Sequence, residues 1–284
     1  MRAFRLIIAA AASVALLGAA PLPAPSAVPR RIVSLNMCAD QLLVALADRR
    51  QIAALTEWAR DPQLSSVAAE ARAIPFTHRS AEEVLVLRPD LVIGAPFRTK
   101  AVLAPLKARG VAMLELPDGE GVAGIEQSIT ALAAAVGHPD RGRRLIATMR
   151  RELAAIGPPP GRGRIAAYYQ RQGYLTGTGT LVDELMQRVG LVNLAGTLGR
   201  PALSKMSLEE MALARPAFLL MDGGTREVAD RGTAALHHPL LDAAVPPERR
   251  IYVPQALIVC GSPAFPRAVK LLADQVRAAD RVRR

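Results

Sequence analysis

Short runs of aliphatic residues alternate along the chain with longer segments that repeat apolar residues at helical spacing. Strands that alternate with helices are typical of parallel sheets with helices on their faces. The pattern therefore predicts an α/β fold with parallel-type sheets. The predicted strands are residues 31–35, 52–56, 91–94, 111–116, 164–170, 218–222 and 250–253.

A long helical stretch divides these strands into two groups. It covers residues 124–136 and 140–156, with a break at Gly137-His138-Pro139. A Gly-Pro-Pro-Pro-Gly segment then ends the helix as a stiff linker. The predicted organisation is a first lobe at 28–139, a linking helix and proline-rich linker at 140–160, and a second lobe at 161–284.

An internal repeat indicates that the two lobes are related. SAEEVLVLRPDLVI begins at Ser80 and SLEEMALARPAFLL begins at Ser207, at a gapless offset of 127 residues. Each serine is expected to cap a helix that leads into a strand, with Glu83 or Glu210 as its reciprocal partner. The alternative is a coincidence between two ordinary helix–strand units.

The first residues have the composition of an export signal. Arg2 and Arg5 precede an apolar run at 6–20, which at 15 residues is too short to cross a bilayer comfortably as a helix. We predict a cleavable signal peptide over residues 1–27 and a periplasmic mature protein, with an uncleaved membrane anchor as the alternative. Loss of Arg2 and Arg5 lowers the net charge from +11 to +9.

The basic charge does not indicate a nucleic-acid partner. No Lys/Arg run reaches five residues and aromatic residues make up only 4% of the chain, so a base-stacking platform is not expected. The sequence also lacks HExxH, GxSxG and CxxC, the motifs of metalloproteases, serine hydrolases and redox enzymes. We therefore predict a protein that is not an enzyme, needs no cofactor and acts as a monomer.

Aromatic and cationic side chains follow several predicted strands. Trp58 and Arg60 follow the second strand, and Phe97 follows the third. Tyr169 and Tyr174 lie at the end of the first strand of the second lobe or just after it. Because ligands bind outside the carboxyl ends of strands in α/β sheets, these side chains could line a cleft for a large, partly anionic ligand. Some must instead belong to the core, since successive strand residues point to opposite faces.

Small polar residues follow the first predicted strand. Ser34, Asn36 and Asp40 lie where that strand passes into a helix. They either line a ligand site at the carboxyl end of the strand or cap the helix, and for Asp40 we favour capping.

The chain contains two cysteines, Cys38 and Cys260. An exported protein enters an oxidising compartment, where a disulfide is permitted. A bond between them would close a loop of more than 200 residues, which is expected to stabilise the fold by about 5 kcal/mol. The alternative is two separate buried thiols, and the sequence leaves both open.

Together these segments resemble the vitamin B12 and iron-siderophore group of ABC-transporter substrate-binding proteins. RIVSLN resembles the family's opening strand, SAEEVLVLRPDLVIGA its helix–strand unit, and YLTGTGTLVDELMQRVGLVNLA the counterpart in the second lobe. SKMSLEEMALARPAFLLM follows, and IYVPQALIVCGSPAFPRAVKLLAD resembles the last strand, cleft loop and terminal helix. The order and spacing of the segments carry the resemblance over nearly the whole mature chain.

The resemblance implies two Rossmann-like lobes joined by one long interdomain helix, with a metal chelate held between them. The chelate would be a ferric siderophore, a corrinoid or haem, delivered to the permease of an ABC importer. Surface glutamates of the two lobes, Glu82 and Glu209 by position, would dock on permease arginines. Ligand contacts would fall on Trp58, Arg60, Phe97, Tyr169, Tyr174 and Cys260.

The chain departs from the B12-binding pattern near its C-terminus. Where that pattern has a large aromatic residue in the last cleft loop, residues 257–261 read LIVCG. The arginines leave room for an anionic siderophore or haem. Two other classes remain as alternatives, a protein that binds a bare metal ion through His78 and a carboxylate, and a secreted α/β enzyme.

Overall fold

The structure, a computed structural model, describes residues 28–94, 100–116 and 121–281 and contains two parallel sheets. The sheet of the first lobe has the strand order β3-β2-β1-β4-β5, with every neighbouring pair parallel. Its strands are β1 (Ile32–Ser34), β2 (Ile52–Thr56), β3 (Phe76–Thr77), β4 (Leu91–Gly94) and β5 (Ala112–Glu115). The helices of this lobe include α1 (Met37–Leu46), α2 (Ala68–Ala71), α3 (Ala81–Val86) and α4 (Lys100–Lys107).

The sheet of the second lobe has the order β11-β10-β6-β8, again with parallel neighbours. Its strands are β6 (Ile165–Tyr168), β8 (Val192–Asn193), β10 (Phe218–Asp222) and β11 (Arg250–Val253). A separate antiparallel pair is formed by β7 (Tyr174–Thr176) and β9 (Leu203–Lys205). The helices are α7 (Leu181–Arg188), α8 (Leu194–Thr197), α9 (Leu208–Ala214), α10 (Pro239–Ala244) and α11 (Phe265–Arg281).

The predicted α/β class and the seven predicted strands are confirmed, with ends that differ by two residues at most. Strands β3, β7, β8 and β9 were not predicted. Each has only two or three residues, and none of them forms the continuous apolar run that marks the equally short β1. The predicted helical stretch is also present, as α5 (Gly121–Ala135) and α6 (Pro139–Ala154).

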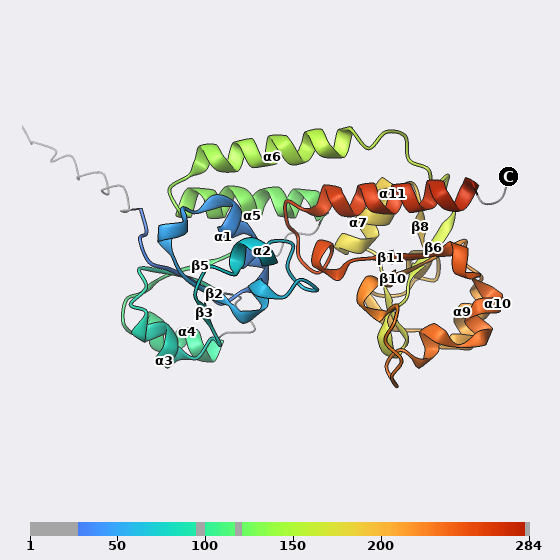
Figure 1. Cartoon of the computed structure of the whole chain (residues 1–284), viewed down its shortest axis with the longest axis horizontal. Helices are drawn as coiled ribbons and strands as arrows, with labels where there is room; N and C mark the ends of the chain where they lie inside the picture. Colours follow the sequence, from blue (N-terminus) through green and yellow to red (C-terminus); the bar gives the residue numbers. More distant parts are fainter. Residues whose placement is uncertain (1–27, 95–99, 117–120, 282–284) are drawn as a thin grey trace, which may run out of the picture.

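Helices α5, α6 and α11 run along one side of both lobes (Figure 1). Helix α6 packs against α5 and against α11, and the chain then passes through residues 155–164 into β6. Among the described residues, no helix is both long and apolar enough to cross a membrane. The lobe boundaries at 28–139 and 161–284 are compatible with this arrangement and stay a proposal.

One apolar core extends through both lobes. It joins Ile32 and Ile93 of the first sheet to Phe218 and Ile251 of the second. Ile129 of α5 belongs to the same cluster, as do several residues of α11. Because a wide separation of the lobes would expose this surface to water, the core opposes large hinge motion.

A polar contact reinforces the junction between α5 and the second lobe. The Glu184 carboxylate on α7 accepts a hydrogen bond from the backbone N–H of Val122 at 2.9 Å, and Arg188 donates to the same carboxylate at 2.7 Å. Gly121 precedes this contact with a φ of +64°, and a Cβ there would collide with the Glu184 side chain. The left-handed backbone angle therefore favours glycine at this position.

The internal repeat has the same local structure in both lobes. Ser80 and Ser207 each accept a hydrogen bond from the N–H of the glutamate three residues later, at 3.1 Å in both cases. Arg88 and Arg215, at equivalent positions after the two helices, have left-handed φ angles of 45° and 43°. Each unit leads into a strand that pairs with the first strand of its sheet.

The predicted capping box forms in the second lobe only. The Glu210 carboxylate accepts from the N–H of Ser207 at 2.8 Å. The Glu83 carboxylate instead accepts from the Thr77 hydroxyl at 2.5 Å and from the N–H of His78 at 2.7 Å. The prediction of a reciprocal box at Glu83 is therefore wrong, because β3 brings nearer donors to this carboxylate.

Cys38 and Cys260 form a disulfide, with their Cα atoms 5.2 Å apart. Cys38 lies at the start of α1 in the first lobe, and Cys260 lies in the loop between β11 and α11. That loop packs closely on the junction, since a Cβ on Gly261 would come within 2.9 Å of Ile125 on α5. Of the two alternatives left open by the sequence, the structure has the disulfide, and it joins the lobes.

Replacing both cysteines by serine should lower the free energy of unfolding by about 5 kcal/mol, because the 222-residue separation leaves a large loop unconstrained in the unfolded chain. Urea denaturation of the oxidised protein and of the Cys38→Ser, Cys260→Ser variant measures the difference. The reduced wild-type protein is the matched control and should unfold with the variant. Equal stability of all three would show that the bond does not constrain the chain.

Candidate functional site

The carboxyl ends of the two parallel sheets meet at the boundary between the lobes. Cys38 follows β1 and Cys260 follows β11, and the disulfide between them brings the two edges together. Ligands bind at the carboxyl ends of strands in open α/β sheets. The facing edges are therefore the candidate site, and the side chains that follow each strand are its candidate lining.

On the first edge, a cation lies over the only tryptophan. The guanidinium carbon of Arg79 is 3.5 Å from the centre of the Trp58 ring, and Arg79 also pairs with the Glu57 carboxylate at 2.5 Å. Trp58 and Arg79 are both partly exposed. Arg79 has a φ of 71°, a left-handed conformation that is uncommon outside glycine and is often found at functional positions. Arg79 was not among the residues predicted from the sequence.

Arg60, predicted to contact ligand, is engaged in local structure. Its guanidinium donates to the Ile74 carbonyl at 2.5 Å and lies 4.5 Å from the centre of the Phe76 ring. These contacts hold the segment between β2 and β3 in place. A ligand contact for Arg60 stays a prediction, and Arg79 is the better placed cation on this edge.

The structure distinguishes between ligand binding and helix capping for the polar residues after β1. Asn36 caps α1, with its side-chain oxygen accepting from the N–H of Cys38 at 2.8 Å. Asp40 is fully buried inside α1 and does not cap the helix, so the favoured prediction of a capping role for Asp40 is wrong. It accepts from the hydroxyl of Thr56 at 2.5 Å and so ties α1 to the carboxyl end of β2. Burial raises the pKa of Asp40 to about 6, against smaller lowering effects of hydrogen bonds from Ser34 and Thr56.

On the second edge, Tyr174 is partly exposed in β7 and has the ammonium of Lys205 5.1 Å from its ring centre. Arg226 lies at the same distance from the Tyr252 ring. A cation beside an aromatic ring therefore occurs on both edges of the boundary. Such pairs are suited to a ligand with apolar faces and anionic groups.

Two predicted ligand contacts, Tyr169 and Cys260, are buried. Tyr169 is only 1% exposed, in the core of the second lobe, and its hydroxyl donates to the Met206 carbonyl at 2.9 Å. This placement argues against a ligand contact for Tyr169. Cys260 is buried and held in the disulfide, which makes it part of the wall between the edges. Phe97 lies outside the described residues, as does the predicted signal peptide.

The predicted docking residues are exposed in both lobes. Glu82 lies in the first turn of α3 and Glu209 in the first turn of α9. Figure 1 shows these helices in different lobes, away from α6. Their equivalent places follow from the repeat, since the two helices begin with the same serine cap.

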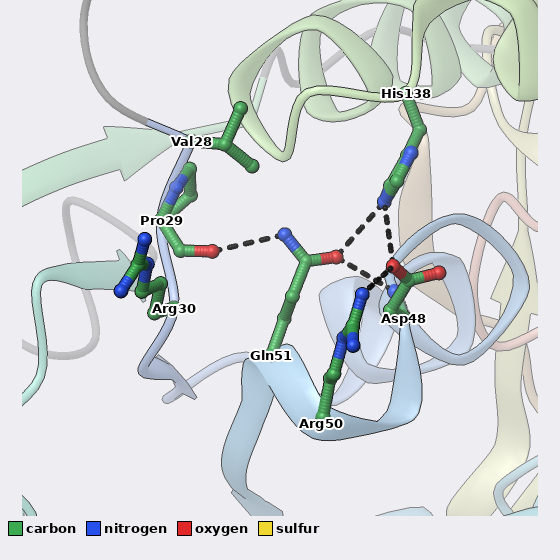
Figure 2. A pocket seen from close by; sticks show the side chains of 7 residues that line it. All are labelled: Val28, Pro29, Arg30, Asp48, Arg50, Gln51 and His138. Carbon is green, nitrogen blue, oxygen red and sulfur yellow. Dashed lines mark hydrogen bonds and ion pairs between the residues drawn. The ribbon is translucent and has the colours of Figure 1, made fainter.

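A hollow of about 600 Å³ lies at the start of the described chain and away from the facing edges. Figure 2 shows that its polar groups bind one another. Gln51 donates to the Pro29 carbonyl at 2.9 Å and its amide oxygen is 3.0 Å from His138. A hydrogen bond from Arg141 is the main cause that lowers the pKa of Asp48. This network anchors the chain beside Pro29 and does not resemble a ligand site.

No metal cluster supports the bare-ion alternative. Within the described ranges, no group of three or more His, Cys, Asp or Glu side chains is placed to hold a metal ion. His78 has one carboxylate neighbour, Glu83, at 3.3 Å, and a protein site for zinc needs three or four ligands.

A family model described as periplasmic binding protein matches residues 32–239. No curated protein sequence matches the chain. Among solved structures, the periplasmic heme-binding protein RhuT from Roseiflexus sp. RS-1 is 25% identical, with a TM-score of 0.71 over 88% of this chain and 98% of that one.

Two further structures have the same fold. A periplasmic heme-binding protein from Pseudomonas aeruginosa is 23% identical, with a TM-score of 0.70 over 88% of this chain and 92% of that one. The periplasmic vitamin B12 binding protein BtuF of Vibrio cholerae is 18% identical, with a TM-score of 0.68 over 89% and 98%. These matches confirm the two-lobed α/β architecture.

The buried carboxyl of Asp40 should make stability depend on pH. Its raised pKa favours the protonated form in the folded state, so its contribution is complete below pH 3.8 and is lost as the pH rises through about 6. The free energy of unfolding should therefore fall by about 3 kcal/mol relative to Asp40→Asn across this window. Urea titrations of both proteins from pH 3.5 to 7.5 test this, and a constant difference between them would contradict it.

Proposed function

Because this chain belongs to the periplasmic binding protein family, we propose that it captures a haem, corrinoid or ferric siderophore between its lobes and delivers it to an ABC importer. The family is one of binding proteins rather than enzymes. The choice of ligand rests on the two facing sheet edges, because each of them has a cation beside an aromatic ring. The names of the heme-binding and vitamin B12-binding structures support the same ligand class.

The charge of the edges favours a chelate with carboxylates or other anionic groups. Arg79 already pairs with Glu57, so an incoming carboxylate would take over or share this cation while the apolar part of the ligand lies near Trp58. On the opposite edge, Lys205 beside Tyr174 offers the second cation. An anion held from both sides would be bound more tightly than one that contacts a single lobe.

Capture would need only a small movement of the lobes. The continuous core and the disulfide hold the edges close together. Binding to a largely preformed site avoids the cost of ordering the site when ligand arrives. Glu82 and Glu209 would then bring the loaded protein onto arginines of the permease, and residues 1–27 would act as the export signal.

Titration of the intrinsic fluorescence should identify the ligand, because Trp58 is the only tryptophan. We expect saturable quenching by one of haem, cobalamin or a panel of ferric siderophores at sub-micromolar concentration.

Arg79→Gln should weaken binding of an anionic chelate about tenfold, as a charged hydrogen-bond partner is lost.

Arg144→Gln is the matched control, since Arg144 is exposed on α6 away from the edges, and it should bind like the wild type. If no chelate changes the fluorescence or competes in equilibrium dialysis, the ligand class is wrong.

Reversing the charge at Glu82 and Glu209 should abolish uptake into proteoliposomes that carry the importer and leave chelate affinity unchanged. Positive side chains at these two positions would repel the arginines expected on the permease. The sheet edges that are proposed to bind the chelate would stay unchanged. Glu152→Arg, on the exposed face of α6, controls for added positive charge. Uptake that persists in the double variant would show that docking occurs elsewhere.

A further inference from the structure

The excess positive charge of the chain is confined to two segments. Residues 28–138 contain twelve basic (Lys, Arg) and twelve acidic (Asp, Glu) residues, and residues 165–264 contain nine of each. The whole charge of +9 that remains without residues 1–27 therefore belongs to residues 139–164 and 265–284. A basic excess that is gathered in this way creates a local field that attracts anionic partners.

The two basic segments are neighbours in the fold. The first consists of α6 and the proline-rich linker that follows it, and the second begins with α11. Helix α6 packs against α11. Figure 1 shows both helices on the side of the molecule away from α3 and α9. The positive charge therefore lies on one side of the protein, apart from the helices that carry the predicted docking glutamates.

A groove runs along α11 within this basic region. It consists of two hollows of about 410 and 540 Å³ that share Arg277 as a lining residue. The first hollow lies between α11 and the end of α6, and the second lies between α11 and the linker. We call the two together the α6–α11 groove. Its basic lining residues are Arg162, Arg267, Lys270, Arg277 and Arg281.

Three cations of the groove are not used by the fold. Among the described residues, the guanidinium groups of Arg162, Arg267 and Arg281 have no hydrogen bond or ion pair, and all three residues are exposed. Arg162 also has a left-handed φ of 53°, which is uncommon outside glycine and is often found at functional positions. These three guanidinium groups are available to an incoming anion.

Most acidic residues of the groove are already paired with other cations. Asp274 pairs with Lys270 at 2.5 Å, and Asp280 pairs with Arg164 at 2.6 Å. Of the described residues that line the groove, Glu152 is the one acid without an ion pair. The groove therefore keeps a positive excess after its internal ion pairs have formed.

The remaining lining residues are apolar, and none of them is aromatic. Ala155, Ile156 and Pro266 line the first hollow, and residues 158–160, all proline, line the second. Apolar surface between cations suits a ligand that combines C–H faces with anionic groups, as a chain of acidic sugars does. A nucleic acid would instead need aromatic side chains on which its bases could stack.

We propose that the α6–α11 groove binds a linear polysaccharide that carries carboxylate groups. Its sugar rings would contact the alanine and proline surface, and its carboxylates would pair with Arg162, Arg267 and Arg281. Arginine suits this role because its planar donors match the two oxygens of a carboxylate. Arg267 and Arg281 lie near opposite ends of α11, about 20 Å apart along the helix axis, so a ligand that reaches both must be extended.

The shape and composition of the groove favour this occupant over other anionic partners. A bilayer surface is flat on this scale and would not enter a groove between helices. An acidic protein would need an apolar centre for its interface, but the exposed large apolar side chains of the described residues all lie outside α6 and α11. A second copy of this chain would bring the same positive charge. The inference goes beyond the proposed function and requires neither chelate nor importer.

The test is binding of polygalacturonate oligomers to the purified protein, measured by isothermal titration calorimetry. We expect saturable binding that weakens as the salt concentration rises, because salt screens exposed charges. Arg162→Gln, Arg267→Gln and Arg281→Gln should each weaken binding about fivefold, since each removes one exposed charge pair. Glu152→Gln should strengthen binding about twofold, because it removes the unpaired acid of the groove.

Arg109→Gln and Arg231→Gln are matched controls. Both residues are exposed and lie outside the groove, and neither has an ion pair in the part of the chain that the structure describes. Each control lowers the net charge by one, as the groove variants do, and should bind like the wild type. Equal losses in the control and groove variants would show that net charge alone attracts the glycan, and would overturn the proposal.

Cosedimentation with phosphatidylglycerol vesicles tests the alternative occupant. Vesicle binding that is lost in the three groove variants and kept in the two controls would assign the groove to lipid and overturn the proposal. A lack of saturable polygalacturonate binding would overturn it as well. Either result would leave the proposed function standing, because chelate binding is measured separately through the fluorescence of Trp58.

Discussion

The apolar core shared by the two lobes is the constraint on which the rest of the structure depends. Ile32 and Phe218 come from different sheets yet belong to one buried cluster, connected through α5 and α11. Water exclusion from this cluster holds the lobes in one arrangement. The carboxyl edges of the two sheets consequently face each other, and the Cys38–Cys260 disulfide keeps them there.

In the proposed function, this arrangement makes the boundary between the lobes a preformed binding surface. The cations on the two edges are not free, because Arg79 is paired with Glu57 and stacked on Trp58, and Lys205 lies near Tyr174. Internal partners keep these long side chains oriented in the absence of ligand, which lowers the entropy that binding must remove. The cost is that a ligand must compete with the partners already present, and this favours ligands that carry strong anionic groups.

The two copies of the repeat have the same serine cap, but the glutamates that follow have different hydrogen-bond partners. Ser80 and Ser207 cap their helices identically, but the glutamate that follows each cap finds different partners. In the first lobe β3 supplies Thr77 and His78 to Glu83, while in the second lobe Glu210 returns to Ser207. Glu82 and Glu209 nevertheless keep equivalent exposed places in the first turns of the two helices.

Much of this protein was determined by its sequence alone. The seven predicted strands, the helices between them and the capped repeat follow from hydrophobic periodicity and from serine and proline positions, which act over a few residues. Tertiary structure decided what depends on contacts between distant segments. It paired Cys38 with Cys260, buried Tyr169 against Met206, and placed Arg79 over Trp58. No spacing along the chain encodes such contacts, because they arise only when two sheets pack around a common core.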